Sequence, residues 1–131
     1  MKHHPTSIRQ VRTVTVPVAD QQRSLDFYTG VLGFEPTIDA QFGPGQRWIE
    51  VAPSDGGTTI ALPPRGSVAP GVDTGIRLST ESAEGDHAAL RAAGVDVDDE
   101  VLKLPGVPPM FSFRDPDGNT LYIVERMEPG T

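Results

Sequence analysis

The side chains best suited to chemistry in this sequence are a tyrosine, a glutamate and a tryptophan on predicted strands. Tyr122 lies in NTLYIVE, the last predicted strand, and Trp48 and Glu50 lie in QRWIEVAP. A glutamate withdrawn from water has a raised pKa and can serve as a base or bind a cationic group, whereas a solvated glutamate at a strand edge does neither. Glu50 and Tyr122 are the candidate catalytic residues. Trp48 offers flat apolar surface, either to a ligand or to the core.

Alternation along the predicted strands places further side chains on the same face as these residues. Ile49 and Val51 are expected to face a helix, which turns Trp48 and Glu50 toward a cleft. For PPMFSF the register stays open, with either Met110 and Ser112 or Phe111 and Phe113 facing inward. Hydroxyls beside flat apolar groups suit a planar organic ligand. The predicted ligand-binding set is Thr13, Thr15, Trp48, Glu50, Thr59, Ala61, Thr74, Ile76 and Tyr122.

The elements that must position these residues begin with a strand in VRTVTVPV, residues 11–18. Asp20 is a good helix N-cap, and Gly33 suits the left-handed residue that ends a helix. Three strands follow, in FEPTIDA, QRWIEVAP and TTIALPP, with glycine- and proline-rich turns between them. Later segments predict a strand in DTGIRLS, a helix in ESAEGDHAALRAAG, and strands in VDVDDEVLK, PPMFSF and NTLYIVE. Asp115 and Asp117 are expected to make turn hydrogen bonds.

This order of elements occurs twice, which predicts an internal repeat. Asp20 and Glu81 mark corresponding helix starts and Gly33 and Gly94 corresponding helix ends, 61 residues apart in both cases. Each half is too small to bury a good core alone, so the halves must pack together. We expect tails at 1–10 and 127–131 and a single domain at 11–126. That domain comprises module one at 11–63, a linker at 64–72 and module two at 73–126.

Composition limits the class of protein further. The absence of cysteine excludes disulfides, thiolate metal sites and a cysteine nucleophile. A net charge of −7 without a basic stripe argues against nucleic-acid binding and mildly favours a cationic ligand. No apolar run approaches the roughly 18 residues of a membrane span, so a cytoplasmic protein is expected. His3 and His4 are assigned to a solvated tail and His87 to the surface or a groove edge.

SLDFYTGVLGFE at the first helix and RDPDGNTLYIVE at the last strand, with the tandem βαβββ order, carry a family resemblance. The sequence resembles the vicinal oxygen chelate superfamily, which includes glyoxalase I, extradiol dioxygenases and the bleomycin and fosfomycin resistance proteins. The resemblance covers about residues 11–126. It implies an α+β fold in which two modules form a U-shaped mixed sheet around a cleft, with helices outside. It also implies a homodimer, with the modules possibly exchanged between subunits.

Metal-using members of the superfamily take one His or Glu ligand from the first and the last strand of each module. The resemblance carries these positions onto Thr13, Ala61, Thr74 and Tyr122, and Thr13 to Ala61 and Thr74 to Tyr122 are both 48 residues apart. None of these is a strong ligand at neutral pH, because a tyrosine with a pKa of about 10 stays protonated. Glu125 lies three residues beyond Tyr122 and is expected on the opposite sheet face. The superfamily's metal site is therefore predicted to be absent.

Missing ligands and a cleft of mixed polarity favour a metal-free protein that binds, and thereby sequesters, a small drug-like molecule, as the bleomycin-resistance branch does. The alternative is a metal-dependent lyase, isomerase or dioxygenase of the glyoxalase type that uses unconventional ligands. An enzyme could otherwise rely on metal-free acid–base chemistry at Glu50 and Tyr122. A third possibility is an accessory domain with a vestigial cleft. No cofactor is predicted, a divalent metal is disfavoured, and whether the protein is an enzyme stays open.

Overall fold

The structure, a computed structural model, describes residues 5–127 and contains two modules with matching order of elements. The expected solvated tail at His3 and His4 lies outside the described residues. Module one comprises β1 (Thr13–Thr15), α1 (Gln21–Asp26), the π-helical turn η1 (Phe27–Val31), β2 (Glu35–Gln41), β3 (Arg47–Ala52) and β4 (Thr59–Ala61). Module two comprises β5 (Asp73–Thr80), α2 (Ala83–Ala92), β6 (Asp96–Val97), β7 (Met110–Arg114) and β8 (Thr120–Glu125).

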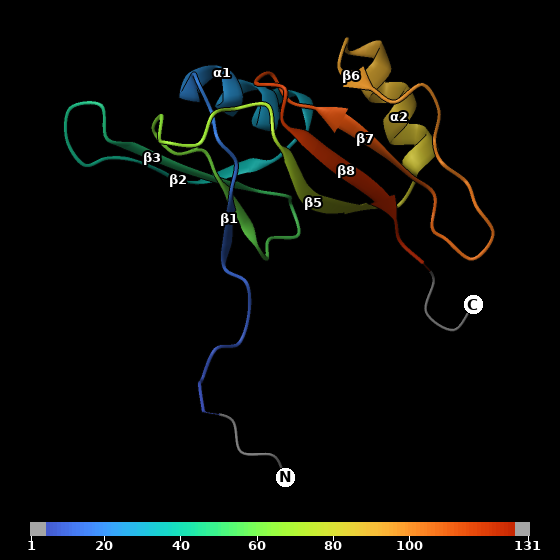
Figure 1. Ribbon diagram of the computed structural model, residues 1–131, viewed down its shortest axis with the longest axis horizontal. Helices are drawn as coiled ribbons and strands as arrows, with labels where there is room; N and C mark the ends of the chain where they lie inside the picture. The colour runs from blue at the N-terminus through green and yellow to red at the C-terminus, as the bar shows by residue number, and fades with distance from the viewer. Residues whose placement is uncertain (1–4, 128–131) are drawn as a thin grey trace.

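Each module forms its own four-stranded mixed sheet. The strand orders are β1-β4-β3-β2 and β5-β8-β7-β6, in which β1 runs parallel to β4 and β5 runs parallel to β8. The remaining neighbours are antiparallel. The two sheets lie next to one another with α1 and α2 on the same side of the molecule (Figure 1). The predicted α+β fold with two βαβββ modules is therefore confirmed.

Capping residues account for where the two helices begin. The Asp20 carboxylate accepts a hydrogen bond from the backbone N–H of Arg23 at 3.1 Å, as expected of an N-cap. The second helix is capped by Ser82, whose hydroxyl accepts from the N–H of Gly85 at 3.0 Å. The prediction that Glu81 marks this helix start was thus one residue early, because Glu81 instead pairs with Arg126.

The segment predicted as a strand over residues 95–103 is largely irregular. Strand β6 covers Asp96–Val97, and beyond it an isolated bridge joins Leu102 to Met110. The Asp98 carboxylate accepts hydrogen bonds from the backbone N–H of Ser112 at 2.7 Å and from its hydroxyl at 2.8 Å. This side chain takes the place of a backbone partner, which interrupts the regular ladder.

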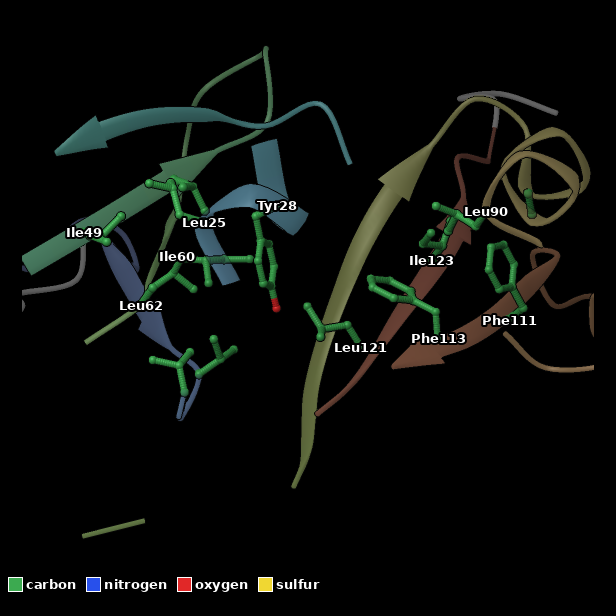
Figure 2. Close-up of a cluster of buried hydrophobic side chains, with 14 residues drawn as sticks. Leu25, Tyr28, Ile49, Ile60, Leu62, Leu90, Phe111, Phe113, Leu121 and Ile123 are labelled. Carbon is green, nitrogen blue, oxygen red and sulfur yellow. The ribbon is translucent and has the colours of Figure 1, made fainter. Parts of the chain in front are cut away.

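A single hydrophobic core connects the two modules. Ile49 and Val51 are fully buried in it, which confirms that Trp48 and Glu50 point to the other face of β3. Phe111 and Phe113 are also core residues, so the open register of β7 is settled with Met110 and Ser112 on the opposite face. Figure 2 shows side chains of both modules meeting around Tyr28 of η1 and Leu121 of β8. We call the sheet face opposite this core the outer face.

His87 belongs to this core, and its predicted position at the surface or a groove edge was wrong. The side chain is buried beneath α2, with its ring in edge-to-face contact with Phe111 at a centroid distance of 5.0 Å. Its Nε2 atom lies 2.6 Å from the carbonyl oxygen of Asp98. The ring has both an apolar and a polar partner, which allows a histidine to be buried beside phenylalanine.

The turn between β7 and β8 hydrogen-bonds internally through the Asp115 side chain, as predicted, whereas the Asp117 side chain bonds to module one instead of the turn. The Asp115 carboxylate accepts from the backbone N–H of Asp117 at 2.9 Å and of Asn119 at 3.0 Å. Gly118 has φ of 80°, a conformation that favours glycine at this position. These bonds shape the turn whose sequence identified the fold.

The same turn also fastens module two onto module one. We define Asp115, Asp117 and Asn119 as the aspartate latch. Asp115 accepts from the Tyr28 hydroxyl at 2.9 Å, and the Asn119 amide donates to the carbonyl of Pro17 at 2.7 Å. The Asp117 side chain is 1% exposed. It accepts from the N–H of Ala19 at 3.2 Å, the guanidinium of Arg23 at 2.9 Å and the hydroxyl of Ser24 at 2.9 Å.

Candidate functional site

Glu50 is the centre of a polar cluster on the outer face of module one. The residue is 2% exposed, although its neighbour Arg12 is 69% exposed. Its carboxylate accepts from the indole N–H of Trp48 at 2.8 Å and from the hydroxyl of Thr59 at 2.8 Å. Longer contacts reach the Thr13 hydroxyl at 3.4 Å and the Arg12 guanidinium at 3.5 Å. Four of the predicted site residues are therefore brought together, along with Arg12.

The environment of Glu50 lowers its pKa. The hydrogen bond from Trp48 contributes most, and the Thr59 hydroxyl and Arg12 act in the same direction, so together they outweigh the opposing effect of burial. The expected raised pKa was therefore wrong, and so was the alternative of a solvated strand edge. A carboxylate with a lowered pKa and occupied lone pairs is a poor general base. Its chemistry here is to hold the surrounding side chains in place.

The lowered pKa has a direct consequence for stability against pH. The interactions that favour ionised Glu50 stabilise the fold above the ordinary glutamate pKa of about 4.3 and are lost as the pH falls through the lower folded-state pKa. We expect Glu50→Gln to reduce the free energy of unfolding by roughly 1.5–3 kcal/mol at neutral pH. This deficit should shrink as the pH falls below about 4. Urea unfolding across this pH range provides the measurement.

The exposed Glu100 offers a matched control, since Glu100→Gln removes the same charge from an irregular segment. A constant difference between Glu50→Gln and the wild-type protein at every pH would contradict this account of Glu50.

Tyr122 belongs to a separate cluster on the outer face of module two. Its hydroxyl donates to the Asp73 carboxylate at 2.7 Å, and the guanidinium carbon of Arg77 lies 4.5 Å from the centroid of its ring. The hydrogen bond to Asp73 is the main cause of a raised pKa for Tyr122. The phenol therefore stays protonated at neutral pH, which removes the phenolate that acid–base or metal chemistry would need.

Strand β5 differs from its predicted orientation. Ile76 packs against the hydrophobic core while also lining a cavity at the module boundary. Pairing between β5 and β8 shifts between Asp73 and Arg77, and Gly75, with φ of 70°, lies within the shift. Arg77 therefore lies opposite Tyr122. Sequence reasoning missed Arg77, although a glycine inside a predicted strand is a known signal of such an irregularity.

The remaining predicted site residues have varied positions. Thr74 donates through its hydroxyl to the carbonyl of Thr120 at 2.7 Å, so it is engaged with the backbone. Thr15 is exposed and lines a cavity of about 530 Å³ beside the linker. Ala61 is fully buried, and its place between Thr15 and Glu50 in the sheet leaves it no free surface.

Two further cavities lie along the boundary of the two modules. Their volumes are about 630 and 290 Å³. Because they share Phe34, Pro53, Leu78 and Ser79, we treat them as one feature, the seam groove. The larger cavity combines Val14 and Ile60 of module one with Thr74, Ile76 and Arg77 of module two.

The predicted site is thus divided between modules. Within residues 5–127 no hydrogen bond or ion pair joins the Glu50 cluster to the Tyr122 cluster. None of the three cavities described above is lined by Trp48, Glu50 or Tyr122. Each module therefore carries one part of the predicted site.

The four positions that would hold a metal in this fold do not fit one. They are occupied by two threonines, a buried alanine and a protonated tyrosine, namely Thr13, Ala61, Thr74 and Tyr122. Across residues 5–127 no three His, Cys, Asp or Glu side chains lie close enough to hold an ion. Divalent cations in proteins prefer imidazole, thiolate or carboxylate donors. The hydroxyls here are instead engaged in hydrogen bonds.

Neither α1 nor α2, the helices of the described chain, has the length and apolar character of a membrane span. In comparison with known protein families, the sequence of residues 10–123 matches the model of the Glyoxalase/Bleomycin resistance protein/Dioxygenase superfamily.

Solved structures and a curated protein extend this similarity. A superfamily member from Sphaerobacter thermophilus DSM 20745 has 33% identity and a TM-score of 0.83, with 92% of this chain and 100% of that chain covered. TnmS3, an antibiotic binding protein from Streptomyces sp. CB03234, has 33% identity and a TM-score of 0.76, with coverage of 93% and 99%. YetH of Bacillus subtilis (strain 168), an uncharacterized protein, is 29% identical over 90% of this chain and 99% of its own length.

Proposed function

Because this chain belongs to the Glyoxalase/Bleomycin resistance protein/Dioxygenase superfamily, we propose that it binds a small, partly aromatic organic molecule without a metal ion and thereby sequesters it. The observation that carries this proposal is the closed hydrogen-bond network of Glu50 with Trp48, Thr59 and Thr13. In this network the polar groups are already paired, which suits a rigid binding surface better than an open coordination sphere. The similarity to TnmS3, which binds an antibiotic, supports the same class of function.

Flat side chains supply the surface for such a ligand. Trp48 is half-buried and oriented by its bond to Glu50, and Tyr122 is half-buried and oriented by its bond to Asp73. Aromatic rings held in this way contribute contact area with little loss of side-chain freedom on binding. By contrast, a glyoxalase-type reaction needs a metal, and among residues 5–127 no three His, Cys, Asp or Glu side chains are grouped so that they could hold one.

Division of the predicted site between the modules supports a cleft that a second copy completes. In a homodimer, the outer face of module one in one protomer would lie against module two of its partner, with the two aromatic clusters on opposite walls. A cleft between protomers would enclose more of a ligand than either outer face alone. We propose a homodimer for this reason.

Thermal unfolding in the presence of planar aromatic compounds, screened as neutral, anionic and cationic sets, tests the proposal. A compound that binds the folded protein should raise the melting temperature, and at about 100 times its dissociation constant it adds about 2.7 kcal/mol to the free energy of unfolding. Trp48→Ala should abolish the shift. Measurement at two protein concentrations reports on the homodimer, because the melting temperature of an oligomer depends on concentration.

Metal content of the untagged protein provides the second half of this test. Cells are grown with added zinc, nickel, manganese and iron, and bound metal is measured by mass spectrometry. We expect much less than one ion per chain. Near-stoichiometric metal that is lost on Glu50→Gln would contradict metal-free binding, and the absence of any stabilising compound across the three sets would contradict the binding function.

A further inference from the structure

The charges on the two outer faces differ in how available they are to a ligand. Glu50 is the carboxylate that the sequence suggested for binding a cation, but it is 2% exposed and already accepts from Trp48 and Thr59. A cationic ligand would have to displace these donors and leave them without partners, which costs free energy. The net negative charge of the chain therefore does not translate into a cation site at Glu50.

Arg77 is the contrasting case on module two. Its side chain is exposed, and within residues 5–127 no carboxylate lies within 4.0 Å of its guanidinium in an ion pair. Its Nη1 donates to the carbonyl of Gly75 at 2.9 Å, whereas its Nε and Nη2 groups make no hydrogen bond in the described chain. Nε and Nη2 form the edge of a guanidinium that binds a carboxylate through two parallel hydrogen bonds.

Tyr122 holds this guanidinium in a fixed plane. The Arg77 guanidinium carbon lies 4.5 Å from the centroid of the ring, and the Tyr122 hydroxyl is anchored by its 2.7 Å bond to Asp73. The second Asp73 oxygen accepts from the N–H of Gly75 at 3.0 Å, so both oxygens of this nearby carboxylate are occupied. One side of the guanidinium therefore faces the Tyr122 ring, which favours a cation at this position.

The seam groove lies next to Arg77. Arg77 lines its larger cavity, whose volume of about 630 Å³ lies within the range of sites for drug-sized ligands. Its walls combine apolar side chains, among them Val14, Ile60 and Leu78, with the hydroxyl-bearing residues Thr58, Thr74 and Ser79. Asp55 also lines this cavity, from the turn between β3 and β4, but forms no ion pair with Arg77.

We infer that the ligand is a planar aromatic acid whose anionic group pairs with the Nε–Nη2 edge of Arg77, beside Tyr122 on the outer face of module two. This inference rests on the proposed small-molecule binding function and specifies the charge of the ligand. It runs against the overall charge of −7, which by itself would favour a cation.

Three ligands that share one ring system test this inference: 2-naphthoate, neutral naphthalene-2-carboxamide and cationic 2-naphthyltrimethylammonium. Their affinities are measured by isothermal titration calorimetry on the full chain at pH 7.5 and about 0.15 M salt, where long-range charge effects are screened. We expect 2-naphthoate to bind about tenfold more tightly than the other two, which corresponds to about 1.4 kcal/mol. Arg77→Gln should abolish this preference, and Arg77→Lys should restore part of it.

Arg91→Gln is the matched control, because it removes the same charge from an exposed position on α2. It should leave the preference for 2-naphthoate unchanged. Thermal melting of each variant confirms that it is folded. Equal or tighter binding of the cation, or an unchanged preference in Arg77→Gln, would contradict the inference and leave the proposed function standing. If none of the three ligands bound the wild-type protein, the inference would be contradicted, and the proposed function would be contradicted only if the wider compound sets also gave no stabilisation.

Discussion

Asp115→Ala is expected to lower the free energy of unfolding by about 3–4 kcal/mol. Asp115 is buried and accepts hydrogen bonds from the Tyr28 hydroxyl, the Asn119 amide and two backbone N–H groups. Its removal leaves several buried donors without an acceptor, and each such group carries a desolvation cost. Urea unfolding followed by circular dichroism measures the change.

Tyr28→Phe separates the contact between modules from the turn itself. It removes one donor to Asp115 and leaves the turn hydrogen bonds intact, so a loss of about 1.5–3 kcal/mol is expected. Asp55→Ala, at an exposed position in the turn between β3 and β4, controls for the loss of a carboxylate. If Asp115→Ala were no more destabilising than Asp55→Ala, the aspartate latch would have no role in stability.

Phe113→Ala should cost about 3–5 kcal/mol, because it deletes a large side chain from a packed interior and leaves a cavity. Phe113 is fully buried, and its ring centroid lies 6.3 Å from that of Phe27 in module one. The substitution therefore weakens both the core of module two and its contact with η1. The same unfolding measurement applies.

Met110→Ala is the natural comparison, since Met110 lies on the same strand but on the outer face. It should cost clearly less than Phe113→Ala, because its side chain is only half-buried. Equal losses for the two variants would mean that the assigned register of β7 is incorrect.

Local signals were sufficient to predict most of the fold. The repeated helix ends, the Asp-Pro-Asp-Gly-Asn turn and the alternation of β3 predicted two modules and the face on which Trp48 and Glu50 lie. The register of β7 could not be predicted, because Met110, Phe111, Ser112 and Phe113 give no clean alternation of polar and apolar side chains. Burial against a distant segment, η1, decides it.

Less of the candidate site could be predicted. Alternation assumes an uninterrupted strand and therefore did not predict Arg77 beside Tyr122, where the irregularity at Gly75 brings it. The pKa of Glu50 was expected to rise because burial alone was considered. Its lowering depends on donors from two strands, Trp48 and Thr59, and on Arg12, whose convergence no single segment reveals.

The aspartate latch also bears on how the chain folds. Its bond from Asn119 to the carbonyl of Pro17 spans 102 positions of the sequence, and that from Ala19 to Asp117 spans 98. Forming contacts between such distant positions closes a long loop, which has a large entropic cost, so these contacts tend to form late in folding. Interactions that form after the folding transition state mainly slow unfolding. The aspartate latch should therefore slow unfolding, and so prolong the lifetime of the native state, more than it speeds folding.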